Sequence, residues 1–176
     1  MMRNHYQKIK LSSGIILFFI SLFLFVSFNS YWEYRFIDQS EIVGKIKYFD
    51  NTQNSLGGLG ALISHFFISL FGFSAYLFIS LTFIFSIKIL FDIKYFRYLN
   101  TLNQHVFFLI WTPILINKFD VDFAGKIGMH ASTKLNILIG HLGTSLLLSA
   151  TIIIFLIIRF NIDQKKIHVF LNLLKF

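Results

Sequence analysis

Residues 57–72 read GGLGALISHFFISLFG, and residues 125–140 read GKIGMHASTKLNILIG. The two stretches share small residues at four positions, and each leads directly into a long apolar run. The shared positions lie 68 residues apart: Gly57, Gly60, Ser64 and Gly72 recur as Gly125, Gly128, Ser132 and Gly140. An internal repeat constrains the architecture of a chain before any other feature does. We therefore expect two similar helical hairpins.

The composition indicates a membrane protein. Of the 176 residues, 56% are hydrophobic and 14% are charged, against about 45–50% and about 25% in soluble domains. Cysteine is absent from the sequence, which excludes disulfides and thiolate metal sites. The expected fold class is an all-α membrane protein with four transmembrane helices as two hairpins, each with a short amphipathic helix before its second span.

Four apolar runs approach the length of about 20 residues that a spanning helix needs. They cover residues 11–28, 72–91, 102–119 and 142–160, and the third is the weakest because it holds His105 and Pro113. The first run lacks a small-residue cleavage site, so we interpret it as an uncleaved anchor rather than a signal peptide. The remaining segments are expected to be a cytoplasmic tail (1–10), a periplasmic loop (29–56), an amphipathic segment (57–71), a cytoplasmic loop (92–101), a periplasmic loop with an amphipathic segment (120–141) and a cytoplasmic amphipathic tail (161–176).

The net charge of +8 is concentrated on one side of this topology. The N-terminal tail, the loop after the second span and the C-terminal tail hold ten of the 16 basic residues and two of the eight acidic ones. Since basic loops remain in the cytoplasm, we expect both termini there, in a bacterial inner membrane. This orientation signal is favoured over a nucleic-acid-binding patch, although anionic lipid would also be attracted to it.

The repeated stretches predict short helices of different character. The first has apolar residues every three or four positions, which gives one apolar face. The second combines an apolar face with Lys126, His130 and Lys134, a pattern typical of helices that lie in the membrane interface. Gly72 and Gly140 are expected to break or kink the chain before the next span.

Small residues at these spacings also allow helices to approach closely. Gly57, Gly60 and Ser64 follow such a spacing, and Gly140 and Gly143 follow a weaker one. The alternative interpretation is the plain start of an interfacial helix.

The sequence around the first stretch resembles a known family. The run NSLGGLGA at 54–61, the pair Phe66-Phe67 and the junction LFGFSAYL at 70–77 resemble the four-helix membrane domain of FtsK/SpoIIIE DNA translocases. In that family a G-x-x-G-A start, an aromatic-rich helix and an F-G-x-x-A-Y junction, here with Ala75 and Tyr76, open the second span. The second stretch, through Gly143, is similar to the opening of the last span. The resemblance covers about residues 11–162.

This resemblance implies a membrane-anchoring and oligomerising domain, hexameric in the family, that places a DNA translocase at the division septum for cell division and chromosome segregation. Its partners would be the lipid bilayer, further copies of the chain and divisome membrane proteins, with no direct nucleic acid binding by this chain. The motor of such translocases needs the phosphate-binding loop G-x-x-x-x-G-K-[ST], and the sequence contains none. We therefore expect no enzyme activity, and the alternative function is a small accessory membrane subunit of a transport or secretion complex.

The residue types that carry chemistry show no recognisable arrangement. None of the six histidines forms an H-x-x-x-H or H-E-x-x-H pattern. The span cores hold no Asp, Glu, Lys or Arg, which argues against an ion-coupled transporter. We expect no catalytic, cofactor-binding or metal-binding residues.

The C-terminal tail predicts one more amphipathic helix. Its apolar stripe consists of Ile167, Phe170, Leu171 and Leu174. We expect this stripe to lie on the inner leaflet, with a protein partner as the alternative.

Overall fold

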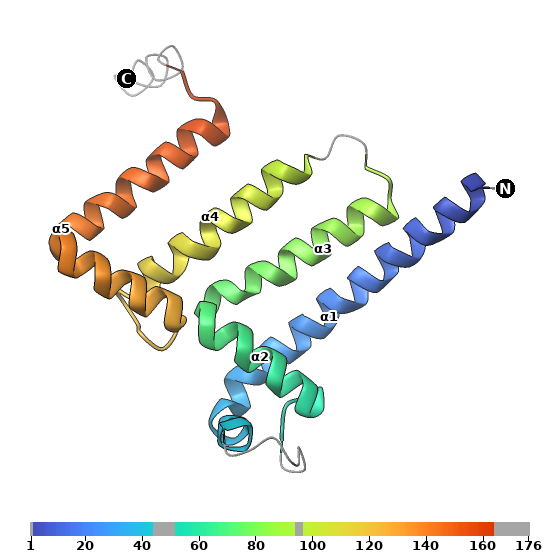
Figure 1. Ribbon diagram of the computed structural model, residues 1–176, viewed down its shortest axis with the longest axis horizontal. Helices are drawn as coiled ribbons and strands as arrows, with labels where there is room; N and C mark the ends of the chain where they lie inside the picture. Colours follow the sequence, from blue (N-terminus) through green and yellow to red (C-terminus); the bar gives the residue numbers. More distant parts are fainter. Residues whose placement is uncertain (1, 44–51, 94–96, 164–176) are drawn as a thin grey trace, which may run out of the picture. The chain divides into compact units, whose positions relative to one another are not determined.

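The computed structural model describes residues 2–43, 52–93 and 97–163, and every regular element in them is helical (Figure 1). The elements are α1 (Met2–Val43), α2 (Gly57–Phe71), the 3₁₀ helix η1 (Gly72–Ala75), α3 (Tyr76–Leu90), α4 (Tyr98–Ile116) and α5 (Gly125–Phe160). The predicted all-α fold class is therefore confirmed. The apolar stripe predicted in the C-terminal tail lies outside the described residues.

Three stretches of helix in the described part of the chain are long and apolar enough to cross a membrane. They are His5–Asp38, Gly57–Leu90 and Gly125–Phe160, and they identify the chain as a membrane protein. Helix α4 is not among them, since polar residues such as Asn103 and Gln104 lie in its first turns. Its 19 residues nevertheless measure about 28 Å, close to the thickness of about 30 Å of a hydrocarbon core. The predicted segment boundaries and the fourth crossing stay predictions.

The chain divides into two compact units, residues 1–130 and residues 131–176. In the first unit, α3 runs antiparallel to α1 and contacts it along its length, and α4 runs antiparallel to α3 (Figure 1). Helix α2 crosses α1 near the end of α1 that carries Arg35. The core of this unit contains Leu24, Phe28, Tyr31, Ile68 and Ala75.

Helix α1 is longer than the span expected at residues 11–28. It continues to Val43, through the first part of the segment expected to be a periplasmic loop. The physical reason is burial, because Phe28 and Tyr31 are 0% and 5% exposed and pack in the core against Ile68 and Ala75. The sequence offers no Gly or Pro between residues 15 and 43 that would end the helix earlier.

Small residues join α1 to its neighbours. The fully buried Ser86 of α3 donates a hydrogen bond of 2.9 Å to the carbonyl of Gly14 in α1. The hydroxyl of Ser27 donates to the carbonyl of Gly60 in α2 at 2.7 Å, and the amide of Asn54 donates to the carbonyl of Ser27 at 3.1 Å. Helices in a membrane associate through such close packing and polar contacts, since lipid is as apolar as their side chains.

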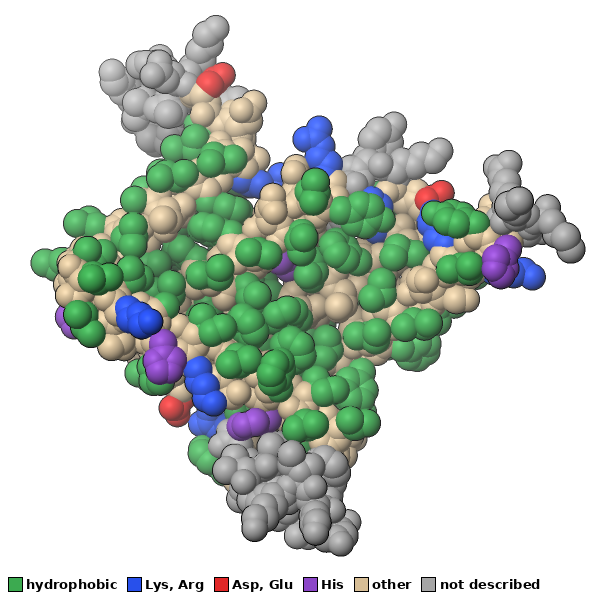
Figure 2. Space-filling model, in the orientation of Figure 1, with side chains coloured by type: hydrophobic (Ala, Val, Ile, Leu, Met, Phe, Trp, Pro, Cys, Tyr) green, Lys and Arg blue, Asp and Glu red, His purple; other side chains and the backbone are tan. Residues whose placement is uncertain are grey.

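Charged pairs lie at both ends of the first unit, with apolar surface between them. Lys10 pairs with Asp92 at one end, and Arg35 lies 3.5 Å from Asp122 at the other. The helix from Lys10 to Arg35 spans about 37 Å, enough for a hydrocarbon core of about 30 Å. On the visible face of this unit, hydrophobic side chains cover the middle of the helices and Lys and Arg lie near helix ends (Figure 2).

The contact between Gly14 and Ser86 predicts how α1 and α3 respond to mutation. Ser86→Ala should lower the free energy of unfolding by about 0.6 kcal/mol, the average for one membrane hydrogen bond. Ser86→Leu should cost about 1–3 kcal/mol, because the larger side chain overfills the contact. Unfolding by SDS in mixed micelles, followed by tryptophan fluorescence, measures both. The control is Phe83→Leu on the exposed side of α3, and equal stability of Ser86→Leu and this control would contradict the prediction.

Candidate functional site

Four glycines in the described residues adopt positive φ, and they form two pairs related by the repeat. Gly57 and Gly125 have φ of 63° and 67°, and Gly72 and Gly140 have φ of 59° and 72°. The second pair also shares an extended ψ, of −140° at Gly72 and 170° at Gly140. Residues with a Cβ rarely adopt this combination. The two stretches therefore share a backbone conformation as well as a sequence pattern.

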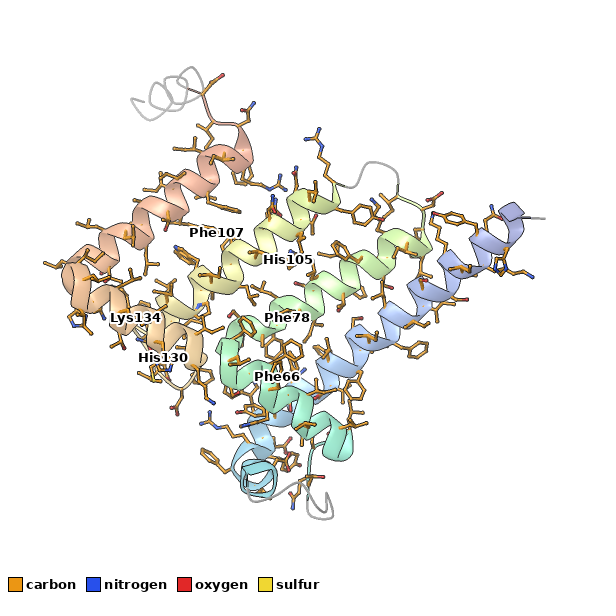
Figure 3. The ribbon with its side chains drawn as sticks, in the orientation of Figure 1. Phe66, Phe78, His105, Phe107, His130 and Lys134 are labelled. Carbon is orange, nitrogen blue, oxygen red and sulfur yellow. The ribbon has the colours of Figure 1, made fainter. Side chains whose placement is uncertain are left out.

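Each pair marks the same point in its helix. Gly57 and Gly125 begin α2 and α5, and Gly72 follows the end of α2. Gly140 is non-helical within α5 and separates an arm at 125–139 from an arm at 141–160. Figure 3 shows His130 and Lys134 on the first of these arms.

The repeat extends to the ends of the following helices, which the sequence analysis missed. Asp92 after α3 and Asn161 after α5 have φ of 50° and 47°. The N–H of Ile93 reaches back to the carbonyl of Lys88 (3.3 Å), and that of Ile162 to the carbonyl of Ile157 (3.0 Å). Both are caps in which a left-handed residue ends a helix and an apolar residue follows. In the sequence, Phe-Asp-Ile at 91–93 corresponds to Phe-Asn-Ile at 160–162. These triplets lie 69 residues apart, so a comparison at the repeat offset of 68 does not align them.

The end of the first stretch meets the start of the second. A Cβ built on Gly72 would lie 2.0 Å from the carbonyl oxygen of Phe123 and 2.7 Å from the nitrogen of Gly125. A Cβ built on Gly125 would lie 2.3 Å from the nitrogen of Gly72 and 2.7 Å from the carbonyl oxygen of Leu70. Neither position has room for a side chain, so both must be glycine. We call this contact the inner junction.

The inner junction is reinforced by a backbone hydrogen bond and by side chains of α1. The N–H of Phe73 donates to the carbonyl of Phe123 at 2.8 Å. Trp32 stacks on the ring of Phe123 with 4.7 Å between centroids, and Arg35 lies 3.5 Å from the carboxylate of Asp122. The segment before α5 is thus held by α1 as well as by the end of α2.

A cavity of about 380 Å³ lies beside the inner junction. Its polar lining comes from α1, α2, the segment before α5 and the first turn of α5, and includes Arg35, His65, Asp122 and Lys126. No group of three or more His, Cys, Asp or Glu residues in the described ranges is placed to hold a metal ion.

The other small residues of the repeat, Gly60, Ser64, Gly128 and Ser132, are all buried. Ser64 is fully buried and donates to the carbonyl of Gly60 at 2.7 Å. A Cβ on Gly128 would lie 2.5 Å from the carbonyl oxygen of Pro113, so the start of α5 packs on the end of α4. Ser132, the counterpart of Ser64, is 1% exposed.

Ala75 and Tyr76 lie just after the inner junction. Ala75 is 0% exposed in the core of the first unit. The ring of Tyr76 meets Phe28 edge to face at 5.7 Å. Gly143, by contrast, faces only its own helix, since a Cβ there would lie 3.0 Å from the Cβ of Ile139.

Gly57 and Gly140 differ from their counterparts. Both are exposed, and a Cβ built on either meets nothing within 4 Å. Their positive φ explains why they are glycine, but the structure brings neither against another backbone.

His105 makes a polar link that the sequence analysis did not identify. Its Nδ1 lies 2.8 Å from the carbonyl oxygen of Thr101, and its Nε2 lies 2.9 Å from Ser80 Oγ, which also donates to the carbonyl of Leu77 at 3.0 Å. Figure 3 places His105 on α4 where it passes α3. The polar contact with Ser80 joins α3 to α4. The sequence feature that could have indicated it is a single histidine in an apolar run.

The inner junction predicts unequal effects of one substitution at two equivalent positions. Gly72→Ala and Gly140→Ala both force alanine into a left-handed conformation, but only Gly72→Ala also places a methyl group against backbone atoms. Gly72→Ala should therefore lose about 1–3 kcal/mol more free energy of unfolding than Gly140→Ala. SDS unfolding of the monomer in mixed micelles measures the difference, and equal losses would show that the close contact does not matter.

The chain matches one family over almost its whole length. The family is described as the 4TM region of DNA translocase FtsK/SpoIIIE, and the match covers residues 8–170. Comparison with curated proteins and with solved structures gave no significant match. The match includes both repeated stretches and the inner junction, and it confirms the resemblance seen in the sequence. The chain therefore belongs to the family of four-helix membrane regions of FtsK/SpoIIIE DNA translocases.

Proposed function

We propose that this chain anchors and oligomerises an FtsK-like DNA translocase in the bacterial inner membrane, at the division septum, during cell division and chromosome segregation. The observation that carries the proposal is the family match over residues 8–170. The 176 residues contain no phosphate-binding loop of the kind that a DNA motor needs. The role proposed for this chain is therefore to position the motor, not to power it.

The architecture supports an anchoring role. The helices of the first unit pack through glycine and serine contacts, while large side chains such as Phe19, Phe25 and Phe83 are exposed. A surface of this kind is suited to contact with lipid or with other membrane helices. In the proposed topology, the end with Lys10 and Asp92 faces the cytoplasm and the end with Arg35 and Asp122 faces the periplasm.

The basic residues then serve to orient the chain. Lys10 and Lys88 lie at the proposed cytoplasmic end of the first unit, and Lys88 sits over the ring of Tyr98 at 3.3 Å. These cations are engaged with neighbours in the protein at the ends of the helices. This placement favours orientation by the bilayer over direct binding of nucleic acid.

Cellular localisation tests the septal part of the proposal. A fluorescent fusion of the full chain should be enriched at midcell beyond a freely diffusing multi-pass membrane protein, whose septal signal rises only because two membranes lie there. Gly72→Ala should reduce the enrichment by disturbing the inner junction. A signal no stronger at midcell than that of the reference protein would contradict the septal role, and co-purification with a transporter instead of divisome proteins would favour an accessory transport subunit.

Cysteine labelling tests the orientation, because the native chain has no cysteine. Val121 and Leu99 are 54% and 72% exposed near opposite ends of α4. Val121→Cys should react with an impermeant maleimide in intact spheroplasts, and Leu99→Cys should react only after the membrane is opened. The reverse pattern would contradict cytoplasmic termini.

A further inference from the structure

The inner junction is a contact between unlike surfaces, and such a contact can be repeated. The end of one stretch, Leu70–Gly72, packs on the start of the next, Phe123–Gly125. A head-to-tail contact of this kind leaves one end surface and one start surface without a counterpart in the same chain. When it is repeated between chains, it generates a ring or a filament.

The two unmatched surfaces are identified by the repeat. The start surface of the first stretch is residues 55–57, equivalent to 123–125, and the end surface of the second is residues 138–140, equivalent to 70–72. The glycines that end these ranges, Gly57 and Gly140, have positive φ close to those of Gly125 and Gly72. Unlike those residues, both are exposed with nothing within 4 Å of a built Cβ.

The flanking side chains show the same difference. Leu70 and Phe71 are half-buried at the inner junction, whereas their counterparts Leu138 and Ile139 are 77% and 47% exposed. On the start side, Ile127 is half-buried and its counterpart Leu59 is 63% exposed. Leu138, Ile139 and Leu59 thus keep the apolar character of their covered counterparts but are exposed. The start surfaces differ in that Ser55 and Leu56 replace Phe123 and Ala124, and Ser55 bonds to Ser30 Oγ of α1.

We propose that residues 138–140 of one chain pack on residues 55–57 of a second copy, in the way that residues 70–72 pack on residues 123–125 within each chain. Inner junctions and these outer junctions would then alternate around a closed ring. The occupant of both open surfaces is another copy of this chain. The inference deepens the proposed function by naming the residues through which the anchor oligomerises, and it rests on that function.

Disulfide trapping tests the outer junction directly in the cysteine-free chain. The inner pair Phe73→Cys and Phe123→Cys is the positive control, because a backbone hydrogen bond of 2.8 Å joins these residues and both side chains are exposed. The equivalent outer pair is Ser55→Cys with His141→Cys, also at exposed positions. The test uses mild oxidation of the full chain in native membranes, followed by non-reducing electrophoresis.

The two double variants should behave differently. The inner pair should form a disulfide within one chain, seen as protected thiols without a change in size. The outer pair should give a ladder of covalent multimers that ends at one size if the ring closes. Each single variant should stay monomeric, and so should Ile16→Cys with His141→Cys, since Ile16 is exposed midway along α1.

A further substitution keeps the proposal falsifiable if cysteine disturbs either surface. Gly57→Asn retains a residue that tolerates positive φ but adds a side chain where the equivalent Gly125 leaves only 2.3 Å. Added to the outer pair, it should reduce the multimer ladder about tenfold, equivalent to about 1.4 kcal/mol of contact energy. The inner disulfide should form as before.

Three results would overturn the outer junction. They are an outer pair that stays monomeric while the inner pair oxidises, an outer pair that closes within one chain, and dimers formed by either single variant, which would indicate a symmetric contact. The outcome is separable from that of the septal proposal. Midcell enrichment without a ladder refutes only the outer junction, and a ladder without midcell enrichment refutes only the septal role.

Discussion

The close approach of the backbones at Gly72 and Gly125 is the constraint on which the first unit depends. Apolar side chains gain little by leaving lipid for one another, so helices in a bilayer are held by packing and hydrogen bonds. Both act over short distances, and a Cβ at either glycine would lie 2.0–2.3 Å from backbone atoms of the other stretch. Without side chains there, the Phe73–Phe123 hydrogen bond can form and Trp32 can stack on Phe123. The segment before α5 is therefore fixed by two glycines and an aromatic pair.

The buried serines are a second use of the same principle. Ser27, Ser64 and Ser86 are all 0% exposed, and each donates to a glycine carbonyl, at Gly60 or Gly14. A hydroxyl buried away from water costs several kcal/mol if it has no partner. A glycine carbonyl provides that partner for each of the three hydroxyls. The bonds of Ser27 and Ser86 therefore join α1 to α2 and to α3, whereas the bond of Ser64 lies within α2.

How far the sequence predicts this structure depends on the range of the contacts. The glycines that adopt positive φ are among the small residues found by the repeat, because a left-handed backbone leaves a local mark in the sequence. The meeting of Gly72 with Gly125 left no such mark, since it joins segments more than 50 residues apart. The extension of α1 to Val43 was missed because it depends on burial of Phe28 and Tyr31 by other helices. The bond between His105 and Ser80 was missed for the same reason, as neither residue indicates its partner.

The order of the two stretches bears on what this membrane domain can do. Transporters often pair inverted repeats, which face each other across a two-fold axis and rock around a site between them. Here the end of the first stretch packs on the start of the second, which is a head-to-tail contact. Two repeats joined head to tail leave one start surface and one end surface without a matching surface in the same chain. A head-to-tail contact of this kind can be repeated between copies of the chain, which is the basis of the outer junction proposed above.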